Sequence, residues 1–243
     1  MYYEESKVSS SIFNTILGSK VRMIPWGLGV DLHKRTDMTN TNVSFDRVQN
    51  IGGSDQDSYW NKTTLTGART NAVKEFTIYT IAADHSRYLD PDKVQRISGS
   101  FQWIIPEERL VPARMTTFGG MYTVRGYEES GIVADGGILA SIQYEFDLVK
   151  YDESKEVEKT GTDVKPFVRK LAPLVFFDYG WAKMEDTVAG ERNEALYSVG
   201  PGVISELGDH FMGVVYYGIP LKTTVTNHYS DNGALNFSLM MRW

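Results

Sequence analysis

The 243 residues contain no cysteine and carry a formal net charge of −6. Disulfides and thiolate metal sites are therefore excluded, and a nucleic-acid partner is not expected. No apolar run reaches the roughly 18 residues of a transmembrane helix, so the chain could cross a membrane only with the strands of a closed barrel.

Apolar and polar side chains alternate along several segments of the N-terminal half, which is the pattern of half-buried strands. Glycine, Asp and Ser at 51–57 predict a loop, and the sequence PEER at 106–109 predicts a tight turn. A further run at 111–118 leads into the glycine-rich stretch that follows. The expected strands are 21–34, 42–48, 59–65, 73–83 and 94–105, of which 59–65 is the weakest.

The stretch 117–137, TFGGMYTVRGYEESGIVADGG, is rich in glycine, so its backbone needs conformations that side chains forbid. One cation, Arg125, stands at its centre between Val124 and Gly126, with Tyr127 just beyond. Long connections inside compact β structure are usually functional or disordered. The stretch is therefore predicted to be a functional loop.

Alternation is clearest after this loop. From Gly137 one face carries apolar side chains from Ile138 to Phe146, and the other carries polar ones that include Gln143 and Glu145. The later strands are expected at 167–182, 196–205, 211–221 and 235–243, with polar connections at 151–163, 183–193 and 223–232.

These segments predict an all-β fold of about 10–11 strands, each about ten residues long, which is the length of a transmembrane β-strand. A soluble β-sandwich can show the same alternation and is the alternative fold. Long aromatic-rich strands, connections that alternate between short and long, and the terminal aromatic Trp243 favour an antiparallel transmembrane β-barrel.

The motif Val124-Arg125-Gly126-Tyr127, preceded by Gly119-Gly120, resembles the signature loop of outer-membrane barrels that carry POTRA domains. Within that superfamily the chain most resembles the two-partner secretion (type Vb) transporters of the haemolysin-activator ShlB/FhaC/HecB family. Two further segments match it. The run from Phe176 through Asp178 to Gly180 is similar to the family's F-x-D-x-G strand motif, and the last strand, with Leu239, Met241 and Trp243, resembles the signal read by the barrel-assembly machinery.

The resemblance implies that the loop folds into the barrel lumen. There Arg125 would meet Asp178 in a charge-assisted contact, with Glu145 as a second acceptor. Alternation along the strand supports an inward Asp178, because it directs Phe177, Tyr179 and Trp181 towards lipid and Phe176 and Gly180 inwards. The alternative is that Asp178 and Glu145 are ordinary wet residues of the lumen.

Several glycines in the C-terminal strands have two possible roles. Gly180, Gly200, Gly202 and Gly218 either make room for a plugged lumen or allow the sheet to curve.

The resemblance further implies an outer-membrane pore that passes an unfolded partner exoprotein without a cofactor. Its other partners would be the barrel-assembly machinery and outer-membrane lipid. Residues 1–243 would be the C-terminal part of a barrel of roughly 16 strands. POTRA domains and earlier strands would precede it, since MYYEESKV is not a signal peptide. The alternatives are an insertion factor for other barrels and a passive porin.

No catalytic, cofactor-binding or metal-binding residues are expected. The four histidines, His33, His85, His210 and His228, lie in or beside loops and turns, and no two have the spacing of zinc ligands. A G-x-S-x-G nucleophile motif is absent from the sequence. A barrel hydrolase is the remaining enzymatic alternative.

Overall fold

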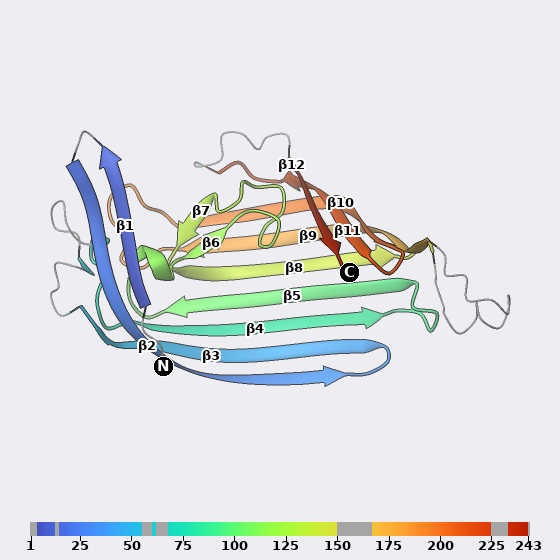
Figure 1. The fold of residues 1–243 in the computed structure, drawn as a ribbon, viewed down its shortest axis with the longest axis horizontal. Coiled ribbons are helices and arrows are strands. Elements are labelled where there is room, and N and C mark those ends of the chain that lie inside the picture. The colour runs from blue at the N-terminus through green and yellow to red at the C-terminus, as the bar shows by residue number, and fades with distance from the viewer. Residues whose placement is uncertain are drawn as a thin grey trace.

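The computed structural model describes residues 4–12, 15–54, 60–61, 68–149, 167–224 and 233–242. Ten strands form one antiparallel sheet in the order β1-β2-β3-β4-β5-β8-β9-β10-β11-β12 (Figure 1). The strands are β1 (Glu4–Ile12), β2 (Thr15–Arg35), β3 (Thr39–Gly53), β4 (Thr77–Tyr88), β5 (Gln95–Pro106), β8 (Gly136–Phe146), β9 (Val168–Lys183), β10 (Glu194–Leu207), β11 (Phe211–Pro220) and β12 (Ala234–Met241).

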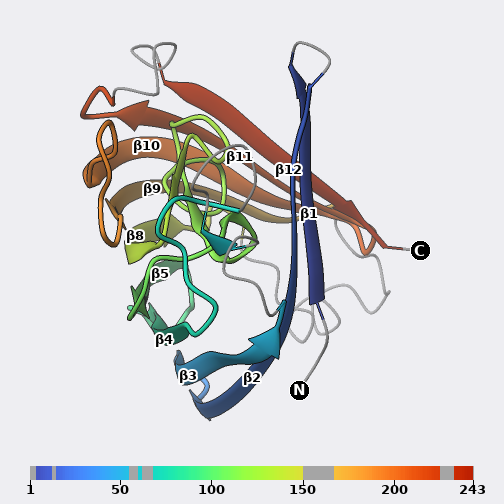
Figure 2. The same ribbon diagram turned by 90° about the vertical axis from the view of Figure 1, so that its left-hand side faces the viewer.

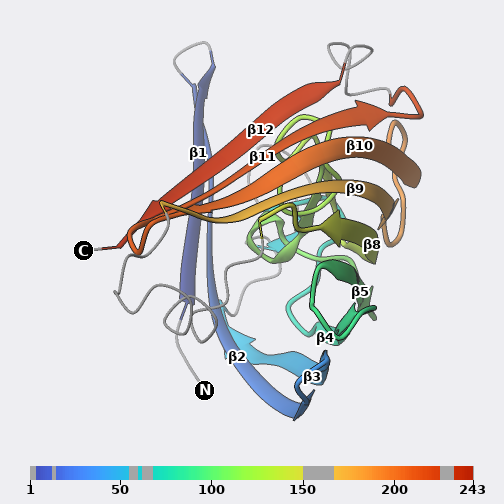
Figure 3. The same ribbon diagram turned by 90° about the vertical axis from the view of Figure 1, so that its right-hand side faces the viewer.

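One segment leaves this sheet between β5 and β8. It contains a short 3-10 helix, η1 (Pro112–Arg114), and a small hairpin of β6 (Thr116–Phe118) and β7 (Ile132–Ala134). Because β5 pairs directly with β8, residues 107–135 are free to lie elsewhere. Figures 2 and 3 show that this inner segment lies on the concave side of the curved sheet.

The strand register places apolar side chains on the convex face. Cross-strand partners there include Val30 with Phe45 and Ile142 with Phe177. On β9, Val175 and Phe177 are 58% and 41% exposed, whereas Phe176 and Asp178 are 4% and 1% exposed. The expected alternation is therefore present, and an apolar outer face of this kind is the one that lipid would cover. Within the described residues, no helix has the length and apolar character needed to cross a membrane.

Two apolar clusters hold the inner segment on the concave side. The first packs the chain just after β5 against the start of β2 and the β3–β4 connection, and the second packs the hairpin against β9 and β10. Full burial of each large apolar side chain contributes about 1.5–3 kcal/mol. The first cluster is Val21, Met23, Trp60, Ala72, Phe76, Leu110 and Val111; the second is Phe118, Val124, Tyr127, Ile132, Ala134, Ala182 and Leu196.

Several predicted boundaries are wrong. Strand β3 runs to Gly53, into the expected loop 51–57, because it pairs with β2 as far as Met23. Residues 106–109 are not a tight turn to the next strand; the chain bends there into the inner segment. Of 111–118, only Thr116–Phe118 is a strand. The strand expected at 59–65 and the connections at 151–163 and 223–232 lie mostly or wholly outside the described residues.

Candidate functional site

The tip of the inner segment carries Arg125 to the concave face of β9. The Arg125 Nε lies 2.8 Å from Asp178 Oδ2, and its Nη2 lies 2.7 Å from Oδ1, so the guanidinium grips the carboxylate with two parallel bonds. The main-chain N–H of Arg125 also donates to Oδ2 at 3.0 Å. Both residues are buried, at 7% and 1% exposure. The expected contact between these two residues is present.

Neutral groups and aromatic rings complete the surroundings of the guanidinium. It donates to Gln143 Oε1 at 2.9 Å and to Ser141 Oγ at 3.1 Å, and Ser141 in turn donates to Asp178 Oδ1 at 2.6 Å. Its central carbon lies 3.5 Å from the ring centre of Phe176 and 4.7 Å from that of Tyr216. Such stacking adds a cation–π attraction to the ion pair. We call Arg125, Asp178, Ser141, Gln143 and Phe176 the tip latch.

Glu145 does not bind Arg125 directly, contrary to the expectation. Its Oε1 lies 2.5 Å from Arg96 Nη2, and Lys170 lies 3.6 Å from its other oxygen. It reaches Arg125 only through Gln143, whose Nε2 donates to Glu145 at 3.0 Å. The physical reason is that two other cations on the inner face are nearer to it, so the carboxylate is neutralised without Arg125.

The other residues of the VRGY motif fix the tip to the wall. Val124 is fully buried, and Tyr127, at 2% exposure, donates its hydroxyl to the carbonyl of Lys222 at 2.7 Å. Tyr127 therefore reaches the wall by a hydrogen bond. Gly126 has a φ of 95°, and a Cβ added there would lie 2.7 Å from the main chain of Gly218. Only glycine fits both positions, because the two backbones touch.

The structure resolves the two roles left open for the strand glycines. A Cβ at Gly180 would lie 2.7 Å from Val124, so this residue, like Gly218, leaves room for the inner segment. A Cβ at Gly200 would lie 1.9 Å from the main-chain oxygen of Tyr217 on β11 and 2.8 Å from the ring of Phe176, and a Cβ at Gly202 would lie 2.6 Å from the ring of Tyr216 and 2.8 Å from the main-chain oxygen of Val215. Gly180 and Gly218 therefore make room for the inner segment, whereas Gly200 and Gly202 allow close approach of the β11 backbone as well as of the aromatic rings beside Arg125.

A polar cavity of about 610 Å³ lies beside the tip latch. It lies between the tip, with Tyr122 and Thr123, and the concave face of β4, β5 and β8. Tyr122 is 82% exposed there. The wall of the cavity is mostly small and uncharged, with Ser86, Ser98, Ser100, Gln102 and Asp84 among its residues.

The terminal strand faces outwards as expected. Leu239 and Met241 are 65% and 54% exposed, while Trp243 lies outside the described residues. Among the residues that the structure describes, no group of three or more potential ligands could hold a metal ion.

A curved antiparallel sheet with an apolar outer face, and with a buried charged loop on its inner side, is the architecture expected of part of an outer-membrane β-barrel. The family model described as "Haemolysin secretion/activation protein ShlB/FhaC/HecB" matches residues 19–203. The chain therefore belongs to this family of transporters, which are not enzymes, and its location is the outer membrane.

The solved structure of CdiB from Escherichia coli is similar to this chain, with a TM-score of 0.69 and 15% sequence identity. The alignment covers 92% of this chain and 38% of CdiB. At this identity the likeness concerns the fold alone, which is a β-barrel. A comparison with curated proteins finds no match.

Sequence reasoning missed part of the latch. Ser141 and Gln143 share the inward face with Glu145, so the alternation pattern could have identified them as candidates. Tyr216 lies on β11, and no local signal connects it with Arg125. The resemblance that suggested Asp178 carried no information about these neighbours.

Proposed function

We propose that the chain is the C-terminal part of the pore of a two-partner secretion transporter. The pore would pass an unfolded partner exoprotein across the outer membrane, without a cofactor. Membership of the ShlB/FhaC/HecB family supports this proposal. The complete barrel would have roughly 16 strands preceded by POTRA domains, and the barrel-assembly machinery would recognise the last strand.

The observation that carries the proposal is the docking of Arg125 on Asp178. It holds the inner segment across the interior, beside a cavity lined mainly by β4, β5 and β8. A polypeptide crossing the barrel would need this interior. We infer that the inner segment is a plug, and that the tip latch holds the plug closed until the exoprotein arrives.

The chemistry of the latch suits a plug that must not leak. Arginine stays charged at any physiological pH and fits a carboxylate with two bonds, so it cannot escape burial by losing a proton. Removing one partner of such a pair typically costs about 3–5 kcal/mol, because the other charge is left buried alone. Ser141 and Gln143 offer the guanidinium neutral partners but no second charge. We infer that binding of the exoprotein supplies the free energy of opening.

A secretion assay tests this function. Cells producing the transporter with Arg125→Ala or Asp178→Asn should release much less exoprotein, although the barrel still resists SDS before heating. Arg192→Ala is the matched control. Arg192 is exposed, and its ion pair with Glu194, at 3.4 Å, is a long one at the surface. Normal secretion by both latch variants would contradict the proposal.

The same cells separate the alternatives. An insertion factor would change the amount of other barrels in the outer membrane, and a passive porin would alter solute uptake without any exoprotein. The proposal expects exoprotein release to change while the amounts of other barrels stay the same. Solute uptake should rise in the latch variants, because a freed tip opens the interior, so the dependence of exoprotein release on the latch distinguishes the proposal from a passive porin.

A further inference from the structure

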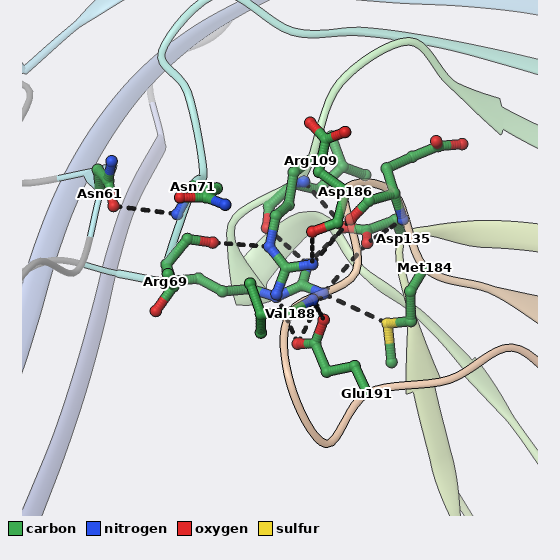
Figure 4. A network of polar contacts seen from close by, with 12 residues as sticks. Asn61, Arg69, Asn71, Arg109, Asp135, Met184, Asp186, Val188 and Glu191 are labelled. Atoms are coloured by element: carbon green, nitrogen blue, oxygen red, sulfur yellow. Dashed lines mark hydrogen bonds and ion pairs between the residues drawn. The ribbon is translucent and has the colours of Figure 1, made fainter.

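A second charged network lies where the inner segment leaves β5 and returns to β8 (Figure 4). It contains two guanidinium groups, Arg69 and Arg109, and two carboxylates, Asp135 and Glu191, so its formal charges cancel. Arg109 is 1% exposed and Asp135 is fully buried. The tip latch contains none of these four residues.

Arg109 ties the first leg of the inner segment to two other connections. Its Nε donates to the carbonyl of Thr70, in the β3–β4 connection, at 2.6 Å. Its Nη1 donates to the carbonyls of Glu185 and Asp186, in the β9–β10 connection, at 2.7 and 3.1 Å. Its Nη2 donates to Glu191 at 2.5 Å. One side chain thus joins three segments that are distant in sequence.

Asp135 ties the second leg to the same connections. It accepts two bonds from Arg69, at 2.5 and 3.1 Å. It also accepts the main-chain N–H groups of Leu110, at 2.8 Å, and Glu185, at 2.9 Å. The bond from Leu110 joins the two legs to each other. The carboxylate is therefore fully used inside the protein.

The base packs in the first apolar cluster, whereas the tip packs in the second. Leu110 and Val111, next to Arg109, are buried against Phe76 and Ala72. The tip latch lies farther along the wall. The β9–β10 connection of the charged network begins after Lys183, where β9 ends. Asp178 of the tip latch precedes Lys183 by about 17 Å of strand, at about 3.3 Å per residue. The two attachments are thus separate in space and use different residues.

We propose that Arg69, Arg109, Asp135 and Glu191 form a base anchor, which keeps both legs of the inner segment fixed to the barrel while the tip around Arg125 detaches. Detaching the base would break the ion pairs of Arg69 with Asp135 and of Arg109 with Glu191, together with the main-chain bonds of Asp135 and Arg109, and would separate the first apolar cluster. Detaching the tip would break one buried ion pair and remove Val124 and Tyr127 from the second cluster. The base also continues directly into β5 and β8. The plug would therefore open as a flap hinged at its base, and the inner segment as a whole would stay in the lumen. This inference rests on the proposed role of the segment as a plug.

The chain contains no cysteine, so single thiol reporters can be added without removing native ones. Val124→Cys supplies a tip thiol and Ala72→Cys a base thiol, since both sites are at most 2% exposed. The measurement is the rate at which a water-soluble maleimide labels each thiol in the purified complete transporter. Arg125→Ala should raise the labelling rate of the tip thiol by roughly tenfold or more and leave that of the base thiol unchanged. Asp135→Asn should raise the labelling rate of the base thiol by a similar factor.

Glu185→Gln is the matched control. Its carboxylate lies on the same connection but pairs with Lys183, so the labelling rate of the base thiol should stay unchanged. Should Asp135→Asn fail to assemble, Glu191→Gln removes a more exposed carboxylate of the network and should give a smaller rise at the base thiol. Equal rises at both thiols in Arg125→Ala would overturn the hinge, as would an unchanged base thiol in both anchor variants. The labelling needs no exoprotein, so its failure is distinct from a failure of secretion.

Discussion

At the scale of single residues, Asp178 holds more of the tip than Arg125 does. It accepts the guanidinium, the main-chain N–H of residue 125 and the hydroxyl of Ser141. Replacing Arg125 by Ala leaves Asp178 with two donors, the main-chain N–H of residue 125 and Ser141. Replacing Asp178 leaves the charged guanidinium with only the neutral acceptors Gln143 and Ser141, and the main-chain N–H of residue 125 without its acceptor. A buried group that loses its partner costs more than the bond itself was worth.

The first prediction is therefore a ranked double-mutant cycle. Arg125→Ala should destabilise tip docking by about 3–5 kcal/mol, and Asp178→Ala by at least as much. The double variant should be no worse than Asp178→Ala alone, because the two residues act as a unit. Hydrogen exchange of the amides at 118–127 measures the docking free energy. Full additivity of the two single effects would contradict the pair.

The second prediction concerns the glycines that touch the tip. Gly218→Ala would place a methyl group 2.4 Å from the main-chain nitrogen of Gly126, and Gly180→Ala one 2.7 Å from Val124. Overpacking of this kind costs about 1–3 kcal/mol, so exchange at 118–127 should accelerate. Gly99→Ala is the control, since its nearest neighbour is 3.5 Å away. Unchanged exchange in Gly218→Ala would mean that the two backbones are not in contact in solution.

At the scale of elements, alternation predicts some strands closely and others poorly: no strand was expected at β1 (Glu4–Ile12), and β4 (Thr77–Tyr88) was expected at 73–83. The expected 94–105 and 167–182 each differ from β5 and β9 by one residue at either end, because a half-buried strand shows its period of two locally. The bend at 106–109 carries no such signal. Arg109 finds its carboxylate partner Glu191 82 positions away, so its role depends on long-range contacts.

The third prediction concerns the pH dependence of the base anchor. The hydrogen bond from Arg109 lowers the pKa of Glu191 below its ordinary value of 4.5, and the charge of Arg69 acts in the same direction. Because the pKa of Glu191 is lower in the folded anchor, its ionised carboxylate stabilises the anchor at every pH above its ordinary pKa of 4.5. This stabilisation disappears as the pH falls through the lower pKa that Glu191 has in the folded protein. Maleimide labelling is slow in acid, so exchange of the amides at 184–191 is the appropriate measurement.

Protection of these amides should fall when the pH drops below about 4.5, after correction for intrinsic exchange. Glu191→Gln should show weaker protection with much less dependence on pH. If protection depended on pH in the same way in Glu191→Gln and in the unchanged protein, the loss of protection in acid would come from a group other than Glu191.

At the scale of the whole molecule, the main sheet ends in two outer strands, β1 and β12. Among the residues that the structure describes, each of these two strands pairs with a neighbouring strand on one side only, and an open edge is not tolerated in lipid. We therefore expect further strands of a longer protein to complete the barrel. The 38% of CdiB that the chain spans is consistent with this view.

The fourth prediction follows from these edges. Residues 1–243 produced alone should aggregate or stay incompletely folded in detergent, whereas the complete transporter should run as a heat-modifiable monomer. The measurement is gel mobility before and after heating, together with size-exclusion chromatography. A monodisperse, heat-modifiable barrel formed by the 243 residues alone would show that they need no further strands.

The sequence also limits what could be said about the site. Arg125 and Asp178 were paired through a family resemblance, since nothing in the local pattern joins residues 53 positions apart. The same resemblance implies that Glu145 accepts from Arg125. The alternation pattern shows only that Glu145 points inwards, and it does not reveal that Arg96 lies closer to Glu145 than Arg125 does. The base anchor went unnoticed, because its four residues lie in connections without periodicity.

If an exoprotein passes through the interior beside the plug, a thiol on the inner wall should cross-link to an exoprotein that is stalled during passage. Ser100→Cys places an inner thiol on the wall of the cavity, and Trp103→Cys places an outer thiol on the opposite face of the same strand, where Trp103 is 40% exposed. An exoprotein with one cysteine in its extended part, stalled by a folded domain, should form a disulfide with the inner thiol and not with the outer one. Absence of the link to the inner thiol, or equal links to both thiols, would contradict passage through this interior.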